Sequence, residues 1–293
     1  MEKPDWIAVD WGTTQLRAFV MRGNVPLASA ESPDGMAQLA PDAFEPALLR
    51  LIDPWLTDAT LPVIACGMVG ARQGWVEAPY RSVPCAPVAT GQTQVVPTRD
   101  PRIRVEIVPG LSQQTSADVM RGEETQIAGF LVQVPEFEGV LILPGTHSKH
   151  VQIAAGQVVR FATHMTGELF ALLSRQSVLR HSVAGDGHVD AAFVEGVESG
   201  LTGHVLERLF SIRAEGLLAG LLPAAARARL SGMLIGAELA RLPAAADYVL
   251  IGNGGLIALY ARAMAVAGLN SKQHDGADLV CKGLGVVRGE MAR

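Results

Sequence analysis

The chain has 293 residues, of which 49% are hydrophobic and 18% charged, and its formal net charge is −5. This length and hydrophobic content are enough for one large domain or two domains of ordinary size. The acidic balance argues against nucleic acid or an anionic membrane as the main partner, and the sequence has no apolar run long enough to span a bilayer.

Cysteine usage and the first residues bear on the compartment. Cys66, Cys85 and Cys281 are odd in number and lack CxxC spacing, which favours free thiols in a reducing environment. No basic start leads into an apolar segment, so we see no secretory signal. These features predict a cytoplasmic protein.

The first predicted elements form a hairpin. An apolar strand at 7–9 leads to Asp10 and a Gly-Thr-Thr turn, and a return strand at 16–21 contains Arg17. Gly12 lets a ligand approach the backbone closely, and Thr13 and Thr14 offer hydroxyl and N–H donors. Asp10 would repel an anion, so it is expected to hold Mg²⁺ or its waters. The alternative is a hairpin whose aspartate only caps a turn.

The rest of the first half alternates strands, helices and loops. A helix at 41–56 precedes a buried strand at 61–66, and a loop-rich stretch follows at 73–85. A strand at 102–108 stops at Pro109 and Gly110. Residues 111–117 are polar and predicted to be loop, and a helix at 123–134 ends before Pro135.

The second half repeats the opening pattern of strand, Gly-Thr turn and hairpin, which suggests duplicated halves. Gly232, Gly236 and Ala240 are spaced four apart in one helix, which permits close contact with another helix. The predicted elements are a strand at 140–143, a turn at 144–148, strands at 150–153 and 158–161, helices at 166–179, 190–210 and 223–241, a strand at 248–251, a turn at 252–255, a helix at 256–267, and a strand at 279–282 before a closing helix.

Three glycine-rich turns follow apolar strands, at 12–14, 144–148 and 252–255. In a two-lobed α/β protein, such turns could converge on a nucleotide and offer it backbone N–H groups. The chain has no GxxxxGK[ST] sequence, which argues against a P-loop site. Residues 252–255 do not match GxGxxG, which argues against a dinucleotide site.

Several polar residues allow both a structural and a functional interpretation. Glu123 and Glu124 lie at a predicted helix start, where carboxylates interact favourably with the helix dipole. Alternatively, one of them could be a catalytic base in a cleft. Glu168 has the same ambiguity. Arg72 and Arg121 could bind a substrate carboxylate or lie at the surface. His147 and His150 lack a third metal ligand, and residues 186–190 are read as a solvated loop.

Residues 10–14 with Arg17 resemble the first phosphate motif of the actin, Hsp70 and sugar-kinase superfamily. Further stretches resemble one branch, the 2-dehydro-3-deoxygalactonokinase family of galactonate catabolism. They lie at 66–70, 74–75, 78–80, 119–126, 143–149, 165–170 and 231–238. The resemblance spans nearly the whole chain, with the motifs in the family order.

This resemblance implies an α/β fold of two RNase-H-like (actin-like ATPase) lobes, 1–135 and 136–293, with ATP in an interlobe nucleotide cleft. The second lobe would carry the second phosphate loop and the adenosine motif. The implied reaction is ATP-dependent phosphorylation of the C6 hydroxyl of 2-dehydro-3-deoxy-D-galactonate, with Mg²⁺. The partners would be the sugar acid and ATP, and a homodimer stays open.

The resemblance also implies residue roles. Asp10 would organise Mg²⁺, and Glu123 would be the catalytic base, with Glu124 and Asp118 as rivals. The nucleotide would be bound by Gly12, Thr13, Thr14, Arg17, Gly145, Thr146, Lys149, Gly252, Gly254 and Gly255. The acceptor would be bound by Gly67, Met68, Val69, Gly70, Trp75, Tyr80 and Arg121.

Two alternatives stay open at this level. One is a kinase for another keto-deoxy sugar acid, because the stereochemistry of one carbon is beyond a motif. The other is a non-catalytic ATP-binding activator or sensor of the same fold. The second phosphate loop lacks the aspartate that many superfamily kinases carry there. Against the activator or sensor, the sequence shows no basic DNA-binding segment and no clustered cysteines.

Overall fold

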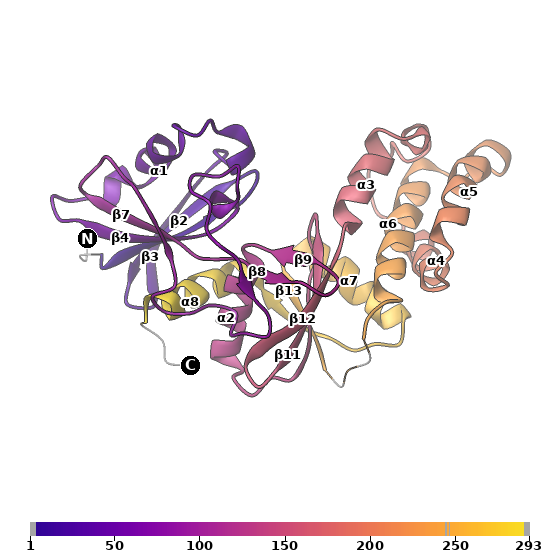
Figure 1. Cartoon of the computed structure of the whole chain (residues 1–293). Coiled ribbons are helices and arrows are strands. Elements are labelled where there is room, and N and C mark those ends of the chain that lie inside the picture. Colours follow the sequence, from indigo (N-terminus) through magenta and orange to yellow (C-terminus); the bar gives the residue numbers. More distant parts are fainter. Residues whose placement is uncertain (1–3, 244, 246, 290–293) are drawn as a thin grey trace. The chain divides into compact units, whose positions relative to one another are not determined.

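The computed structural model describes residues 4–243, 245 and 247–289. Among them, one compact unit comprises residues 4–138, 152–161 and 276–289. The other comprises residues 139–151 and 162–275. The first unit contains a six-stranded sheet, and most of a five-stranded sheet belongs to the second, although residues 152–161 of two of its strands are grouped with the first (Figure 1).

A six-stranded sheet with the order β3-β2-β1-β4-β7-β6 forms the centre of the first unit. The first three strands are an antiparallel meander, and β4 and β7 continue parallel to β1. The strands are β1 (Trp6–Trp11), β2 (Leu16–Arg22), β3 (Val25–Ser32), β4 (Leu61–Gly67), β6 (Gln94–Val96) and β7 (Ile103–Ile107). A smaller sheet joins β5 (Arg81–Ser82), β8 (Leu111–Gln113) and β9 (Asp118–Met120).

The helices α1 (Phe44–Ile52), α2 (Glu123–Gln133) and α8 (Gly276–Arg288) cover the six-stranded sheet. Successive side chains of a strand point to opposite faces. Odd-numbered residues of β1 from Ile7 to Trp11 pack with residues of α1. Trp6 and Ala8 pack with residues of α2 and α8. By the same alternation, Asp10 belongs to the face that α2 and α8 cover.

The helices α2 and α8 lie side by side (Figure 1). Their backbones approach closely through glycines, since a Cβ on Gly129 would lie 2.0 Å from the Leu279 carbonyl oxygen. A Cβ on Gly283 would lie 1.9 Å from the Thr125 carbonyl oxygen. This packing joins the end of the chain to the first unit. The two units therefore differ from a division into continuous lobes at 1–135 and 136–293.

The second sheet has the order β12-β11-β10-β13-β14, which matches the order β3-β2-β1-β4-β7 in the first. β13 runs parallel to β10, and β14 runs parallel to β13. The strands are β10 (Gly139–Leu143), β11 (Ser148–Ala154), β12 (Gln157–His164), β13 (Tyr248–Gly252) and β14 (Lys272–Asp275). The predicted α/β class with two RNase-H-like, actin-like ATPase lobes is confirmed.

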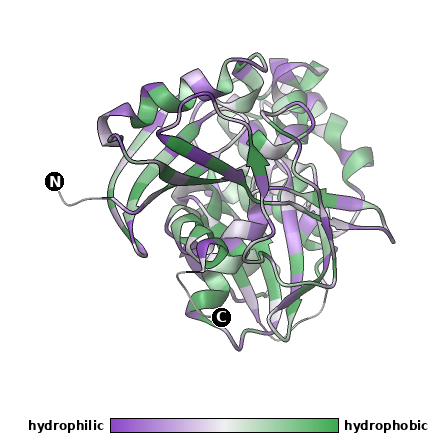
Figure 2. Ribbon diagram, turned by 60° about the vertical axis from the view of Figure 1, so that its left-hand side comes forward, coloured by the Kyte–Doolittle hydropathy of each residue, from purple (hydrophilic) through white to green (hydrophobic). Residues whose placement is uncertain are grey.

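The second unit also contains α3 (Thr166–Arg175), α4 (Asp190–Leu201), α5 (Val205–Leu218), α6 (Pro223–Leu239) and α7 (Gly254–Val266). Hydrophobic and hydrophilic residues alternate along several helices (Figure 2), as in helices with one buried face. A Cβ on Gly232 or Gly236 would lie 2.2 or 2.3 Å from a carbonyl oxygen of α4. The predicted close contact of this small-residue helix is confirmed.

Two predicted elements have the wrong type or length. The strand predicted at 279–282 is wrong, because these residues lie within α8 and the last strand is β14. The single helix predicted at 190–210 is wrong, because it is divided into α4 and α5. Gly203, with φ of 80°, lies in the left-handed region and ends the first of them.

Other differences are smaller. The helix predicted at 41–56 is shorter, with α1 followed by a 3-10 turn at Asp53–Trp55. The helix predicted at 166–179 ends at Arg175, before a second 3-10 turn at Val178–His181. The loop predicted at 111–117 begins with β8, and the short strands β5 and β6 and the exposed strand β3 were not predicted. Further 3-10 turns lie at Met36–Gln38 and Met68–Gly70.

Candidate functional site

The turn between β1 and β2 is held by backbone hydrogen bonds. Gly12 N–H donates to the Gln15 carbonyl at 2.9 Å, and Ala37 N–H donates to the Thr13 carbonyl at 3.0 Å. The turn leaves Thr13 and Thr14 exposed. The backbone of the turn is therefore fixed while these two threonines stay exposed, and their role as phosphate donors stays a prediction.

Asp10 is paired within the hairpin. It is the register partner of Arg17, whose guanidinium donates to the Asp10 carboxylate. Burial raises the pKa of the Asp10 carboxyl above its ordinary value, and the Arg17 guanidinium opposes this shift. The Asp10 side chain keeps 15% of its surface exposed, so it is not fully closed off from solvent.

Asp10 and Glu124, a residue of α2, both act electrostatically on Cys66. Cys66 is the register partner of Asp10 in β4. Burial, together with the charges of Asp10 and Glu124, raises the pKa of the Cys66 thiol well above its usual value. Two of the predicted site carboxylates therefore lie within electrostatic reach of the same thiol.

The segment after β4 takes its shape from glycines. Gly67 has φ of 92°, and a Cβ there would lie 2.7 Å from the Trp11 carbonyl oxygen. A Cβ on Gly70 would lie 2.9 Å from Nη1 of Arg121. Val69 is buried and Met68 is half-buried. The segment thus brings its backbone against Arg121, another residue predicted to bind the acceptor.

Trp75 and Tyr80 have different surroundings. The Trp75 ring lies 6.3 Å from Phe44 and 6.1 Å from Trp11, centroid to centroid, within the α1-side core. Tyr80 is 40% exposed, and its ring covers the Arg121 guanidinium at 4.3 Å. Trp75 is thus a half-buried residue packed against this core, whereas Tyr80 lies at the surface above a cation.

Arg121 is a buried cation with incomplete hydrogen bonding. The residue is 8% exposed, and its Nη2 donates to the Ala78 carbonyl at 2.8 Å. Within the described part of the chain, Nε and Nη1 are buried without a hydrogen-bond partner. A desolvated guanidinium with two unsatisfied nitrogens is unfavourable unless an anion or water completes it.

The two glutamates at the start of α2 differ in exposure. Glu123 is half-buried and accepts a hydrogen bond from the Arg121 N–H at 3.0 Å. Glu124 is fully buried and accepts from Gly122 N–H at 2.7 Å and from the Thr125 hydroxyl at 3.0 Å. Burial, with the nearby Glu123 charge, raises the pKa of Glu124 to about 7.

This shift predicts a pH-dependent stability. The folded state holds the Glu124 proton up to a pKa of about 7, whereas the unfolded state loses it near 4.5. The folded state binds more protons in this window, so the free energy of unfolding should fall as pH rises from 4.5 to 7. Chemical denaturation of Glu124→Gln and the native chain at pH 4.5 and 8 should reveal a difference that changes by roughly 3 kcal/mol.

Glu136→Gln is the control, because Glu136 is exposed and belongs to the same unit as Glu124. Glu136→Gln should follow the native pH profile. If Glu124→Gln also runs parallel to the native chain between pH 4.5 and 8, Glu124 is ionised throughout and the raised pKa is wrong.

In the second unit, the turn after β10 packs on the start of α3. A Cβ on Gly167 would lie 2.4 Å from the Gly145 carbonyl oxygen, and Glu168 N–H donates to the Thr146 carbonyl at 3.0 Å. Thr146 is exposed, whereas Lys149 is buried and donates from Nζ to Thr163 at 2.7 Å. The turn offers backbone and hydroxyl groups, and the lysine points into the protein.

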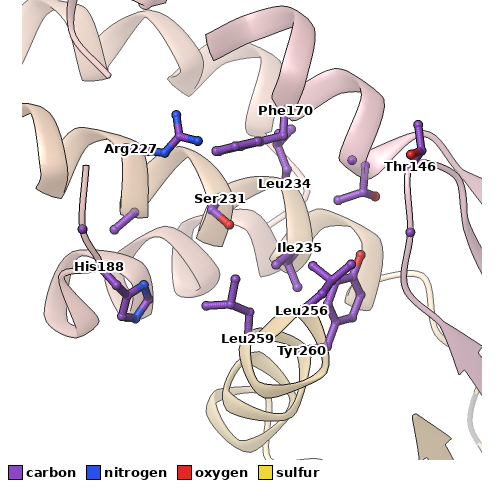
Figure 3. Close-up of a pocket in the computed structure, with 15 residues that line it drawn as sticks. Thr146, Phe170, His188, Arg227, Ser231, Leu234, Ile235, Leu256, Leu259 and Tyr260 are labelled. Atoms are coloured by element: carbon purple, nitrogen blue, oxygen red, sulfur yellow. The ribbon is translucent and has the colours of Figure 1, made fainter. Parts of the chain in front are cut away.

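A cavity of about 470 Å³ opens beside this turn (Figure 3). Side chains of α6 and α7 form two of its walls, and the start of α3 and His188 contribute others. The labelled lining residues are Thr146, Phe170, His188, Arg227, Ser231, Leu234, Ile235, Leu256, Leu259 and Tyr260. Its volume and mixed lining are typical of a small-molecule site.

The turn after β13 leads into α7. Gly254 and Gly255 are exposed, and a Cβ on either would have no atom within 4 Å among the described residues. Gly252 is half-buried, with the nearest atom 3.5 Å from a built Cβ. Packing within the described residues therefore does not require glycine at 254 and 255. The open space beside these two glycines leaves room for a ligand to approach the start of α7.

The sequence missed several residues of this region. His188 lines the cavity, although its segment was read as a solvated loop. Arg227 and Ser231 had no separate signal, although Ser231 begins a stretch that resembles the family. Glu238 is a buried acid in the same helix, with three hydrogen-bond donors around its carboxylate.

The described residues contain no group of three or more His, Cys, Asp or Glu side chains arranged to hold a metal ion. A metal bound by one carboxylate, phosphate oxygens and waters does not need such a group. No helix in the described part of the chain is long and apolar enough to cross a membrane.

Comparison with known proteins gives consistent matches. A family model described as 2-keto-3-deoxy-galactonokinase matches residues 10–287. The protein named probable 2-dehydro-3-deoxygalactonokinase of Rhizobium meliloti is 40% identical over 292 residues, or 95% of each chain. The 2-dehydro-3-deoxygalactonokinase of Escherichia coli is 37% identical over 273 residues, or 90% of each chain.

A solved structure agrees with these relatives. The crystal structure of a candidate 2-dehydro-3-deoxygalactonokinase protein from Sinorhizobium meliloti superposes with a TM-score of 0.90. The two sequences are 38% identical, and the match covers 96% of this chain and 97% of the other.

Proposed function

Because the chain belongs to the 2-keto-3-deoxy-galactonokinase family, we propose that it transfers the γ-phosphoryl group of ATP to the C6 hydroxyl of 2-dehydro-3-deoxy-D-galactonate. The product is 2-dehydro-3-deoxy-6-phosphogalactonate. The proposal places the reaction in the cytoplasm, because ATP is the donor. Phosphoryl transfer depends mainly on positioning and on stabilising charge.

The incomplete hydrogen bonding of the buried Arg121 guanidinium is the main support for an acceptor that has a carboxylate. Its buried Nε and Nη1 lack a partner among the described residues, and the acceptor carboxylate would supply one. Both nitrogens are covered, so Tyr80, which lies over the guanidinium, would shift when the acid binds. Gly67, Met68, Val69 and Gly70 would line the same acceptor site, and the half-buried Trp75 would support it.

Glu123 is the residue that we assign as base. It is half-buried next to Arg121, so its carboxylate can reach the attacking hydroxyl and orient or deprotonate it. Glu124 has a pKa of about 7, which suits a base, but its oxygens are buried and engaged by Gly122 and Thr125. Glu124 would therefore fix the start of α2 and not contact the acceptor.

The second unit would bind most of the nucleotide. The cavity beside the Gly145–Thr146 turn has room for the adenosine, between the apolar side chains of α6 and α7. The backbone and hydroxyl of that turn would bind phosphate oxygens. Gly252, Gly254 and Gly255 would allow close approach at the start of α7. Thr13 and Thr14 would supply phosphate donors from the first unit.

Mg²⁺ fits the donors around Asp10. It is usually bound by one or two carboxylates together with phosphate oxygens and waters, and Asp10 offers one partly exposed carboxylate. When bound, the ion would neutralise charge on the phosphates. Arg17 orients the Asp10 carboxylate through their ion pair.

Asp10→Asn is expected to lower kcat by about 10²–10³, because losing one pre-organised charge contact typically costs ~2.7–4 kcal/mol. Asparagine keeps the size of the side chain, so the fold should persist. ADP release at saturating ATP and acceptor measures the effect, and circular dichroism checks the fold. A folded variant with near-native turnover would remove Asp10 from the mechanism.

A panel of keto-deoxy sugar acids, offered with ATP and Mg²⁺ and followed by ADP release, tests the function. The proposal expects 2-dehydro-3-deoxy-D-galactonate to give the highest kcat/KM. Preference for an epimer would transfer the assignment to another keto-deoxy acid. ATP binding without turnover on any acceptor would instead identify a non-catalytic activator or sensor.

A further inference from the structure

Glu238 is a buried carboxylate with donors from three different elements. The residue lies near the end of α6 and is 3% exposed. His150 Nε2 of β11 contacts Oε1 at 2.8 Å. Thr166 of α3 and Tyr260 of α7 both donate their hydroxyls to Oε2, the second at 2.6 Å. Glu238 itself does not line the 470 Å³ cavity.

The network continues to the backbone of the turn after β10. Ser148 Oγ lies 2.8 Å from the Tyr260 hydroxyl. Because Tyr260 donates to Glu238, Ser148 is left to donate to Tyr260. Ser148 Oγ then accepts the Gly145 N–H at 3.4 Å. A chain of hydrogen bonds with one direction therefore runs from the Gly145 amide to the Glu238 carboxylate.

A second connection runs through the start of α3. Thr166 is the first residue of that helix, and it is fixed by its bond to Glu238. The next residues contact the turn directly, since Gly167 lies against the Gly145 carbonyl and Glu168 N–H donates to Thr146. Glu238 thus reaches the Gly145–Thr146 backbone from both sides, although it touches neither residue.

The carboxylate is charged at neutral pH. Burial alone would raise its pKa, but the hydrogen bonds from His150, Thr166 and Tyr260 hold the pKa of Glu238 below its ordinary value. A buried carboxylate is costly unless such donors compensate it. An apolar residue would fill the same place without that cost. The presence of an acid here therefore indicates that the protein needs its three donors, His150, Thr166 and Tyr260, held in fixed positions.

We propose that Glu238 is a positioning residue for ATP, which holds the Gly145–Thr146 turn in its phosphate-binding geometry through Tyr260, Ser148 and Thr166. The inference rests on the proposed binding of ATP phosphates by this turn. A displacement of the turn by about 1 Å would affect binding and transfer strongly, because phosphoryl transfer depends on position. The acceptor residues of the first unit would not be affected.

Two variants test this role. Glu238→Gln keeps the shape, but its amide nitrogen cannot accept from the surrounding donors. Tyr260→Phe keeps the ring in the cavity wall and removes only the hydroxyl that connects Ser148 with Glu238. We expect the Kd for ADP, measured by calorimetry, and the KM for ATP to rise about tenfold or more in Glu238→Gln. In Tyr260→Phe they should rise by at least about threefold, and the acceptor KM should stay within about twofold in both.

Tyr248→Phe is the matched control. It removes another buried tyrosine hydroxyl of the same unit, one that contacts Pro243 and Ala245 and not the turn. Tyr248→Phe should lower the melting temperature comparably and leave ADP affinity unchanged. The proposal is overturned if the Tyr260→Phe variant binds ADP within twofold of native, or if Tyr248→Phe weakens ADP binding equally.

If the Glu238→Gln variant does not fold, the ADP affinity of Tyr260→Phe is sufficient to test the proposal. Failure of the proposed function is a separate outcome, because ADP affinity does not depend on the acceptor. A native chain that binds ADP but phosphorylates no keto-deoxy acid would refute the kinase assignment. A native chain that phosphorylates the acid, with unchanged ADP affinity in Tyr260→Phe, would refute only the role of Glu238.

Discussion

Glu123→Gln is expected to lower kcat by about 10²–10⁴, the range that general-base assistance supplies. Glutamine keeps the size of the side chain and can still accept the Arg121 N–H, so the local structure should persist. It cannot take the proton of the attacking hydroxyl. Affinity for ATP should change little, because the proposed nucleotide residues lie mostly in the second unit. Steady-state ADP release with saturating ATP and acid measures kcat.

The neighbouring Glu124→Gln variant separates the two acids. Glu124 is fully buried, and its oxygens accept hydrogen bonds from the Gly122 N–H and the Thr125 hydroxyl. We expect its kcat to fall by less than about tenfold, since its role is to position the start of α2. Asp118→Asn, in β9, is the third comparison. If kcat falls strongly in Glu124→Gln or Asp118→Asn and stays near the native value in Glu123→Gln, the substituted residue and not Glu123 is the base.

The sequence could predict the elements whose local signals agree with their packing. The strand ending at Asp10 was recognisable because an apolar run precedes a Gly-Thr-Thr turn. Its even and odd positions are buried in two different cores, which explains why the run is apolar throughout. The small-residue spacing at Gly232 and Gly236 likewise corresponds to close packing on α4.

The last helix shows where local pattern fails. The residues Leu279, Val280 and Cys281 form a short apolar run, which sequence periodicity cannot assign to a strand or a helix. They form part of α8, which is buried over most of its surface between the sheet and α2. Within α8, Gly283 lies against the Thr125 backbone, which is distant in sequence. Tertiary packing therefore fixes this element.

The candidate site shows the same limit. Motifs identified the turns that carry backbone donors, but they could not show that Lys149 is buried against Thr163. They also gave no role to Glu238, because its partners His150 and Thr166 lie 88 and 72 residues away. A single acid in an Ala-rich helix has no local signal. Networks of this kind become visible only when the fold brings the donors together.

Acceptor choice should show the largest effect of all. We expect kcat/KM for 2-dehydro-3-deoxy-D-galactonate to exceed that for galactose or glucose by ~10⁴–10⁵. A neutral hexose lacks the carboxylate and would leave the buried nitrogens of Arg121 unpaired. ADP release with each acceptor under the same ATP and Mg²⁺ conditions measures the ratio.

Arg121→Ala should narrow this ratio, mainly by losing activity on the acid. Its guanidinium also donates to the Ala78 carbonyl, so thermal unfolding must be measured beside the kinetics. Arg72→Ala is the matched control, because the Arg72 side chain is 81% exposed and only approaches Glu77 at 3.7 Å. It should leave the ratio unchanged. Comparable kcat/KM for galactose and the keto-deoxy acid in the native enzyme would defeat the carboxylate argument, and the proposed acceptor with it.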